Sequence, residues 1–468
     1  VFIDPVHGGT PTAGEREWRT VVVGTLRQGG PWVFGLDVTY PDQIDTTTTS
    51  PTFGEKTDAK NDSPDCANGG GSCPSRYPEV MWEITDDCLL VAPCEGIPKM
   101  GETWSKPVVG RIRISNGAAF EDRYVAIFGG GFDPSQRPGD PIRLTDELVA
   151  PFRKATRGWA IYVVDVETGK IIYKGTAGFR NDTTAVNFAP IAAGMAAIDW
   201  DDDGYLDAAY VGDINGRIWR LDLIPDALSV ASPRRGELVA GKLTYRPFLL
   251  YDASTSASEP LQPFFLDAGL IFMAGGPRPV IGVALGSGDR SELARPNLRP
   301  VGASLVPFKN RAHLVVDSGQ VTTAEEDNLR NITPGNDGLG PYNSGCSDGT
   351  YCTGFRLDFE SQNEKGTSTM FATDGFLSLV TFTPDATNPC ATEGNSFRYR
   401  FFYLTGSSRQ GTNNYAEYRD FAGGGYASPS QSNTKSETND WIFSVGGGVR
   451  QEITTFSVTT INQNWKEQ

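Results

Sequence analysis

A short motif recurs along the chain: an aromatic residue, any residue, Leu or Val, Asp, and an apolar residue. Its clear copies are FGLDV (34–38), YVVDV (162–166), WRLDL (219–223) and FRLDF (355–359), with weaker copies at 249–253, 314–318 and 399–403. The first, third and fifth positions are apolar. In an extended strand a period of two places such positions on one face. The chain is therefore predicted to repeat one kind of half-buried strand.

In two copies of the motif the pattern predicts which side chains point into the core together. They are Phe34, Leu36 and Val38 in the first copy, and Trp219, Leu221 and Leu223 in the third. An apolar strand precedes the third copy, and Asn215-Gly216 between them predicts a type I′ hairpin, because both residues tolerate positive φ.

Repetition of such strand–turn–strand units predicts an all-β chain. Four-stranded meanders repeated about seven times form a β-propeller, in which each sheet packs against its neighbours. The copies are unevenly spaced, so we expect a modified propeller with degenerate blades and long insertions. The alternative is a β-sandwich built from ordinary strands. Composition agrees with β structure, since Gly and Pro number 54 and 31 and no long stretch has helical apolar spacing.

The whole chain, 1–468, is interpreted as one propeller domain with loop insertions in two places. Residues 43–79 and 407–440 are polar and rich in Gly, Ser and Thr, so each is predicted to be a loop insertion. Residues 145–155 and 325–331 are each expected to give a helical turn or two. Since the chain starts with a strand-like sequence, VFIDPVHGG, we expect a fragment or a processed form.

The charge balance excludes some classes of partner. The net charge is −16 and no cluster of Lys and Arg occurs, which argues against nucleic acid and favours cation binding. No apolar run is long enough to span a bilayer.

Seven cysteines lie in the chain, and six form close couples in loop-like sequence. The couples are 66/73, 88/94 and 346/352, with Cys390 left over. None has the CxxC spacing of a zinc or thioredoxin site, so disulfides in an oxidising compartment are favoured over free thiols. The connectivity of the first four, and the partner of Cys390, stay open.

The sequence DWDDDGYLD concentrates five aspartates in nine positions. Asp199, Asp201, Asp203 and Asp207 occupy positions 1, 3, 5 and 9, with Gly204 at position 6, where a sharp bend is needed. Calcium takes six to eight oxygen ligands, and a loop that turns alternate carboxylates inward supplies most of them. The backbone carbonyl of Tyr205 is the predicted ligand at position 7.

This loop departs from an EF-hand in two ways. Position 12 is Tyr210 where an EF-hand has a bidentate Glu, and a strand follows where a helix would. Asp202 is expected to face outward. The alternatives are a solvated acidic turn without metal and, less favoured, magnesium, which seldom uses this many protein carboxylates.

Catalytic machinery is sparse in the sequence. Only His7 and His313 occur, and no GxSxG, HExxH or phosphate loop is present, so the chain is predicted not to be an enzyme. Two other propeller classes remain as alternatives. A quinoprotein dehydrogenase would have eight regular Trp-bearing blades and a vicinal cysteine pair. An integrin-like propeller would repeat the aspartate loop in several blades.

Several segments, taken in order, resemble the C-terminal propeller domain of the PilC/PilY family, the type IV pilus tip-associated adhesins. The most specific is AIDWDDDGYLDAAYVGDINGRIWRLDL (197–223). The others include WRTVVVGTLRQGGPWVFGLDVT (18–39), YVAIFGGGFD (124–133), WAIYVVDVETGKIIYK (159–174), VALGSGDR (283–290) and GFLSLVTFTP (375–384).

The resemblance implies a non-enzymatic, calcium-binding protein that is exported through the periplasm and carried outside the cell at the pilus tip, the fimbrium. Its implied partners are the minor pilins and a host or abiotic surface, and its implied roles are pilus assembly, adhesion and twitching motility. The family's calcium loop falls on Asp199, Asp201, Asp203, Tyr205 and Asp207, and metal there is implied to regulate pilus extension against retraction.

Overall fold

The computed structural model describes residues 1–3, 16–39, 43–44, 56–57, 78–85, 99–116, 119–133, 157–181, 183–223, 237–239, 242–253, 262–274, 279–301, 304–319, 322–333, 353–373, 375–385, 394–407, 419–424, 427–432, 440–445 and 448–452. Within them the chain is all-β, and its one helical element is the 3-10 turn η6 (Glu326–Asn328). This turn lies within the predicted helical stretch 325–331. The cysteines, His7, the stretch 145–155 and most of the insertion at 43–79 fall outside the described residues.

Four sheets of five to seven strands form the body of the molecule. The first contains β8 (Val108–Asn116), β9 (Ala119–Gly129), β10 (Ile161–Asp165), β11 (Ile171–Gly175), β17 (Glu237–Val239) and β18 (Lys242–Thr244). The second contains β12 (Ala177–Arg180), β13 (Thr184–Asn187), β14 (Ala196–Ile198), β15 (Ala208–Gly212), β16 (Arg217–Asp222), β19 (Phe248–Asp252) and β25 (Ala324–Glu325).

The other two large sheets follow along the chain. The third contains β20 (Gly269–Ala274), β21 (Val280–Gly286), β24 (Arg311–Asp317), β26 (Arg330–Asn331) and β27 (Gly354–Asp358). The fourth contains β28 (Lys365–Gly366), β29 (Phe371–Thr373), β30 (Phe376–Pro384), β31 (Gly394–Phe402) and β32 (Arg419–Gly424).

Smaller sheets complete the described structure. They are β1 (Phe2–Ile3) with β2 (Glu17–Trp18); β3 (Val21–Thr25), β4 (Trp32–Asp37) and β7 (Glu79–Thr85); β5 (Gln43–Ile44) with β6 (Lys56–Thr57); β22 (Leu298–Val301) with β23 (Ser304–Pro307); and β33 (Ala427–Ser432), β34 (Asp440–Val445) and β35 (Gly448–Glu452).

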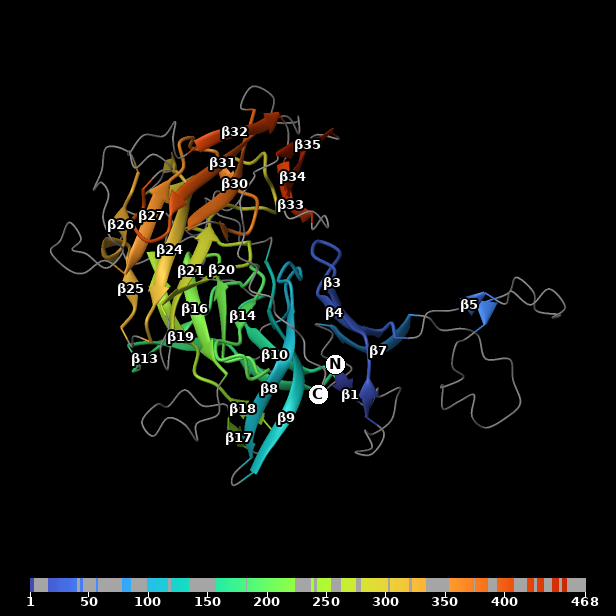
Figure 1. Ribbon diagram of the computed structural model, residues 1–468. Coiled ribbons are helices and arrows are strands. Elements are labelled where there is room, and N and C mark those ends of the chain that lie inside the picture. Colours follow the sequence, from blue (N-terminus) through green and yellow to red (C-terminus); the bar gives the residue numbers. More distant parts are fainter. Residues whose placement is uncertain are drawn as a thin grey trace.

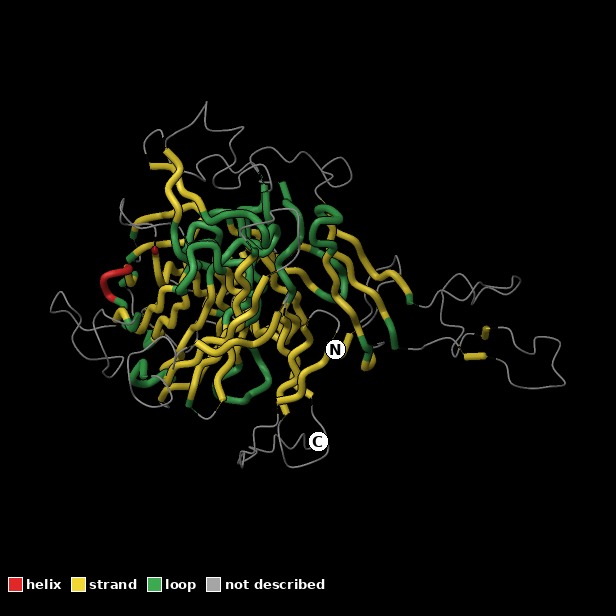
Figure 2. Tube along the Cα trace, turned by 90° about the horizontal axis from the view of Figure 1, so that it is seen from above, coloured by secondary structure: helices red, strands yellow, loops and turns green. Residues whose placement is uncertain are grey.

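The large sheets are arranged as blades of a β-propeller. In Figure 1 they follow one another from cyan through green and yellow to orange, and Figure 2 shows the strands from above. The predicted all-β, propeller-like fold is therefore confirmed. Four large blades lie within the described residues, and the predicted count of about seven stays a prediction. Two strands, β32 and β33, lie within the predicted insertion at 407–440. Of these, β32 pairs with β31 and extends the fourth blade.

Every copy of the repeated motif lies on a strand, but the face that it buries differs between blades. Trp219, Leu221 and Leu223 are buried, as predicted. In the first copy the alternate face is the buried one: Val33 is inaccessible, whereas Phe34 is only half-buried. The β3–β4–β7 sheet packs this Val33 face on the neighbouring blade, and the opposite face carries exposed apolar side chains, at Val22 and Val80.

The aspartate of the motif has a partner that the sequence did not reveal. Asp37 is 5% exposed and accepts a hydrogen bond from Arg19 Nη1 at 3.0 Å. Asp317, in a weaker copy, is 1% exposed and accepts one from the fully buried Arg220 at 2.6 Å. Buried carboxylates require such partners. The copy at 399–403 has Phe402 in place of the aspartate. The remaining motif aspartates pair as follows: Asp165 with Arg123, Asp222 with Arg220, Asp252 with Arg180 and Arg217, and Asp358 with Arg311.

The hairpin predicted at Asn215-Gly216 forms between β15 and β16, but its turn is not type I′. Only Gly216 has a positive φ, of 82°. The N–H of Gly216 donates to the carbonyl of Asp213 at 3.2 Å, and the N–H of Asp213 donates to Arg217 at 2.9 Å. The Asp213–Arg217 pair therefore closes a three-residue loop, 214–216, with Gly216 in the left-handed position. The buried carboxylate of Asp213 also accepts from Asn215 N–H at 2.9 Å, which favours this longer turn.

Candidate metal centre

The aspartate-rich loop connects β14 and β15 in the second blade. These strands pair in antiparallel register, with Ile198 opposite Ala208. The loop closes on itself where Asp207 N–H donates to the Ile198 carbonyl at 2.8 Å. The carbonyl of Asp207 accepts from Leu223 N–H on the neighbouring strand at 2.7 Å. Both loop ends are thus fixed by the sheet, while the turn between them projects toward solvent.

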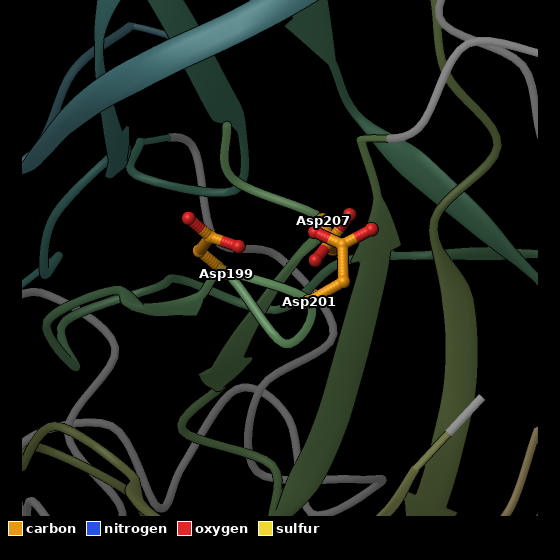
Figure 3. A group of neighbouring side chains, drawn as sticks. All are labelled: Asp199, Asp201 and Asp207. Atoms are coloured by element: carbon orange, nitrogen blue, oxygen red, sulfur yellow. The ribbon is translucent and has the colours of Figure 1, made fainter. Parts of the chain in front are cut away.

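Three of the predicted ligand residues are brought together. Asp199, Asp201 and Asp207 each offer a carboxylate oxygen, and these atoms all lie within 4.8 Å of one another. Figure 3 shows the three side chains on the loop. Asp207 is buried, Asp199 is half-buried and Asp201 is exposed. Asp203 does not belong to this group: its Oδ1 accepts from Tyr205 N–H at 2.9 Å. Asp202 is exposed, as expected.

Hydrogen bonds inside the loop turn its backbone amides toward the carboxylates. Asp199 accepts from Gly204 N–H at 2.8 Å and from Asp203 N–H at 3.3 Å. Gly204 has a φ of +85°, and open space surrounds the position where a Cβ would be. Its conformation, not crowding, therefore accounts for glycine at the bend.

The electrostatics of the loop favour a cation. Burial, together with the nearby charges of Asp201, Asp199 and Asp203, raises the pKa of Asp207 to about 7. The hydrogen bond from Trp200 N–H at 2.7 Å opposes this rise but does not cancel it. A buried carboxylate beside like charges is stabilised when a positive ion joins them. Hard carboxylate oxygens at this spacing suit calcium, so the residues present fit that ion.

A cluster that the sequence did not point to holds the side chain of Tyr205. Its hydroxyl accepts from Arg113 at 2.5 Å and donates to Asp122 Oδ2 at 2.7 Å. The guanidinium carbons of Arg111 and Arg113 lie 4.4 and 4.1 Å from the ring centroid. The Arg111 carbonyl also accepts from Leu206 N–H at 2.8 Å. The β8–β9 hairpin of the first blade therefore contacts the aspartate-rich loop of the second blade through hydrogen bonds and cation–π interactions.

The charge of this cluster is balanced locally. Burial alone would raise the pKa of Asp122, but hydrogen bonds from Tyr205, Arg113 and Arg111 outweigh it and lower that pKa. The two arginines are therefore engaged by Asp122 and the Tyr205 ring, and they hold the loop from its outer side. The sequence offered no signal for this contact, since Arg113 and Asp122 lie 92 and 83 positions before Tyr205.

His313 plays no part in this site. It lies fully buried on β24, with ring centroids 5.5 Å from Tyr251 and 5.6 Å from Phe264. Its place on a strand, between packed aromatic rings, identifies it as a core residue of the blade. Among the described residues, no helix has the length and apolar character needed to cross a membrane.

Comparison with known proteins relates this chain to pilus proteins. No family model matches it. Over 237 residues, half of the chain, it is 26% identical to the type IV pilus biogenesis factor PilY1 of Pseudomonas aeruginosa, and over 211 residues 26% identical to the PilY1 homolog of Xylella fastidiosa. The chain is homologous to PilY1. The matched parts are 13% and 10% of those relatives, so the chain corresponds to a small portion of their length.

The fold matches as well. The crystal structure of the Pseudomonas aeruginosa PilY1 C-terminal domain superimposes with a TM-score of 0.53, covering 93% of this chain and 81% of that domain at 18% identity. The likeness extends over nearly the whole chain, beyond the half that aligns in sequence. The predicted relation to the C-terminal propeller of this family is confirmed.

Proposed function

We propose that this chain is a calcium-binding, non-enzymatic propeller of a type IV pilus biogenesis protein. The role in pilus biogenesis is supported by homology to proteins named as pilus biogenesis factors. The observation that carries the calcium proposal is the convergence of three carboxylates within 4.8 Å on one loop. Calcium is preferred to magnesium because the ligands are mostly protein carboxylates, and an octahedral magnesium site seldom uses this many.

In this proposal Asp199, Asp201 and Asp207 hold the ion, and Asp203 and the Tyr205 carbonyl join them. The bound ion supplies positive charge that offsets the repulsion within the loop. The sheet fixes both loop ends through the backbone contacts of Asp207. The Tyr205 side chain fixes the outer side through Asp122. The backbone of the loop is therefore largely ordered before the ion binds, and ion binding fixes the positions of the carboxylate side chains.

The finer functions follow from the family resemblance. We propose that the protein acts outside the cell at the pilus tip, with the minor pilins and a host or abiotic surface as its partners. There the ion would regulate extension against retraction of the pilus, and so twitching motility and adhesion. The hydrogen bonds from the first blade to Tyr205 in the loop of the second blade support this, because a rearrangement of the loop on metal binding would alter contacts in both blades.

The test replaces the native gene in the source bacterium by one encoding Asp201→Ala in the full-length protein. Asp201 is exposed, so the protein should fold and accumulate normally. We expect altered surface piliation and a smaller twitching zone. Asp202→Ala, the neighbouring exposed aspartate outside the carboxylate group, is the control and should behave as wild type. Normal piliation and twitching in an Asp201→Ala strain whose protein no longer binds calcium would overturn the proposed regulation.

A further inference from the structure

A second candidate binding site lies away from the metal carboxylates, between the β1–β2 ribbon and the β8–β9 hairpin. It is a cavity of about 330 Å³. The residues that line it are three aromatic side chains and two pairs of opposite charge: Phe2, Trp18, Tyr124, Arg16, Glu167, Arg111 and Asp122. This volume is at the lower end of the range for small-molecule sites.

Two aromatic rings form one wall of this cavity. Phe2 and Trp18 are directly opposite each other on β1 and β2, and their ring centroids are 5.5 Å apart. Trp18 is 70% exposed and Phe2 is 43% exposed. Tryptophan is usually well buried, so an exposed one beside a cavity has a face available for a ligand.

The polar walls carry fixed donors and acceptors with no net charge. Arg16 donates to both oxygens of Glu167, at 3.0 and 2.9 Å, which is a bidentate pair. Glu167 is 5% exposed, so its geometry is well defined. On the other side Arg111 donates to Asp122 at 2.6 Å. Two guanidinium groups and two carboxylates cancel one another, so a strongly charged ligand would have to displace an existing ion pair.

From this combination we propose that the cavity binds a neutral saccharide. The C–H face of a pyranose ring stacks on Trp18, and Phe2, whose ring is tilted by 54° to that of Trp18, contacts the edge of the sugar. Its hydroxyl groups donate to the carboxylates of Glu167 and Asp122 and accept from Arg16 and Arg111, because each hydroxyl both donates and accepts. The volume admits a mono- or disaccharide unit. Such a site would give the adhesive role proposed above a chemical ligand, and its test is independent of calcium and of pilus function.

The test applies the purified 468-residue chain to an array of immobilised mono- and oligosaccharides, and then titrates the strongest binder by calorimetry. We expect measurable binding that Trp18→Ala weakens at least about tenfold and Trp18→Phe weakens less, because a smaller ring keeps part of the stacking face. Trp32→Ala is the matched control. Trp32 is also an exposed tryptophan, at 45%, but it does not line the cavity.

Three results would overturn the proposal. The first is an array on which no saccharide binds above background. The second is a saccharide whose affinity is unchanged by Trp18→Ala or is reduced equally by Trp32→Ala. The third is binding of tetramethylammonium chloride at the cavity with no binding of saccharides, which would identify the aromatic wall as a site for organic cations. Equal melting temperatures of Trp18→Ala and wild type establish that a loss of binding is not a loss of folding.

Discussion

Replacing Asp207 by Asn should change stability in opposite directions with and without calcium. Asn keeps the size of the side chain and the oxygen that accepts from Trp200 N–H. It removes the negative charge, which burial and the neighbouring aspartates make unfavourable in the ion-free protein. The ion-free variant should therefore be more stable than ion-free wild type, whereas the variant should gain much less from calcium.

The magnitude follows from the perturbed carboxyl. Each tenfold change in proton affinity corresponds to about 1.4 kcal/mol. A rise of the Asp207 pKa from 3.8 to about 7 therefore destabilises the ion-free fold by up to roughly 4 kcal/mol at pH 8. The folded pKa is the higher one, so the folded state binds more protons. The destabilisation grows as the pH rises from about 4 to about 7 and is then constant.

The assay is thermal melting at pH 8 in EDTA and in excess calcium. In EDTA the Asp207→Asn protein should melt above wild type, and in calcium it should melt below. Its calcium affinity should fall at least about a hundredfold, since ligand charge strongly tunes such sites. The Asp202→Asn protein, changed at an exposed aspartate outside the group, should match wild type in both buffers. A variant that is less stable than wild type in EDTA would refute the electrostatic reasoning.

Three further predictions concern single side chains. Tyr205→Phe loses the hydroxyl that is hydrogen-bonded to Asp122 and Arg113, so calcium affinity measured by calorimetry should fall about fivefold. An unchanged affinity would show that these hydrogen bonds do not support the loop. Burial lowers the pKa of His313 to about 3, so the wild-type protein should lose stability as the pH falls below 6.5. Measured by urea unfolding at pH 4.5, this loss of unfolding free energy should exceed that of His313→Phe by about 2 to 3 kcal/mol. Equal losses in the two proteins would contradict a neutral, buried histidine. Gly216→Ala places a side chain at φ +82° and should lower the unfolding free energy by at least about 1 to 2 kcal/mol while calcium affinity stays constant.

The strands of the blades could be predicted from the sequence because their apolar period is local. WRLDL and FRLDF alternate strictly, and their apolar residues are buried. The buried face of FGLDV could not be predicted in this way. Which face is covered depends on the neighbouring blade, and here the Val33 face has that neighbour. The turn at Gly216 was mispredicted for a related reason: the Asp213 carboxylate, two residues before Asn215, stabilises a longer loop.

The candidate metal loop was also visible in the sequence, because its carboxylates lie within nine residues. The structure brings Asp199, Asp201 and Asp207 together and leaves Asp203 bonded to the Tyr205 amide. The contact of Tyr205 with Asp122 joins residues 83 positions apart, so local pattern could not reveal it. The arginine partners of the motif aspartates were missed for the same reason, since several come from distant strands.

Calorimetric titration of the purified chain with calcium at neutral pH tests the central claim most directly. The account predicts saturable binding of calcium at the 199–207 loop, abolished by Asp201→Ala and much tighter than binding of magnesium under the same conditions. Binding that survives Asp201→Ala unchanged, or the absence of saturable binding in wild type, would contradict the account.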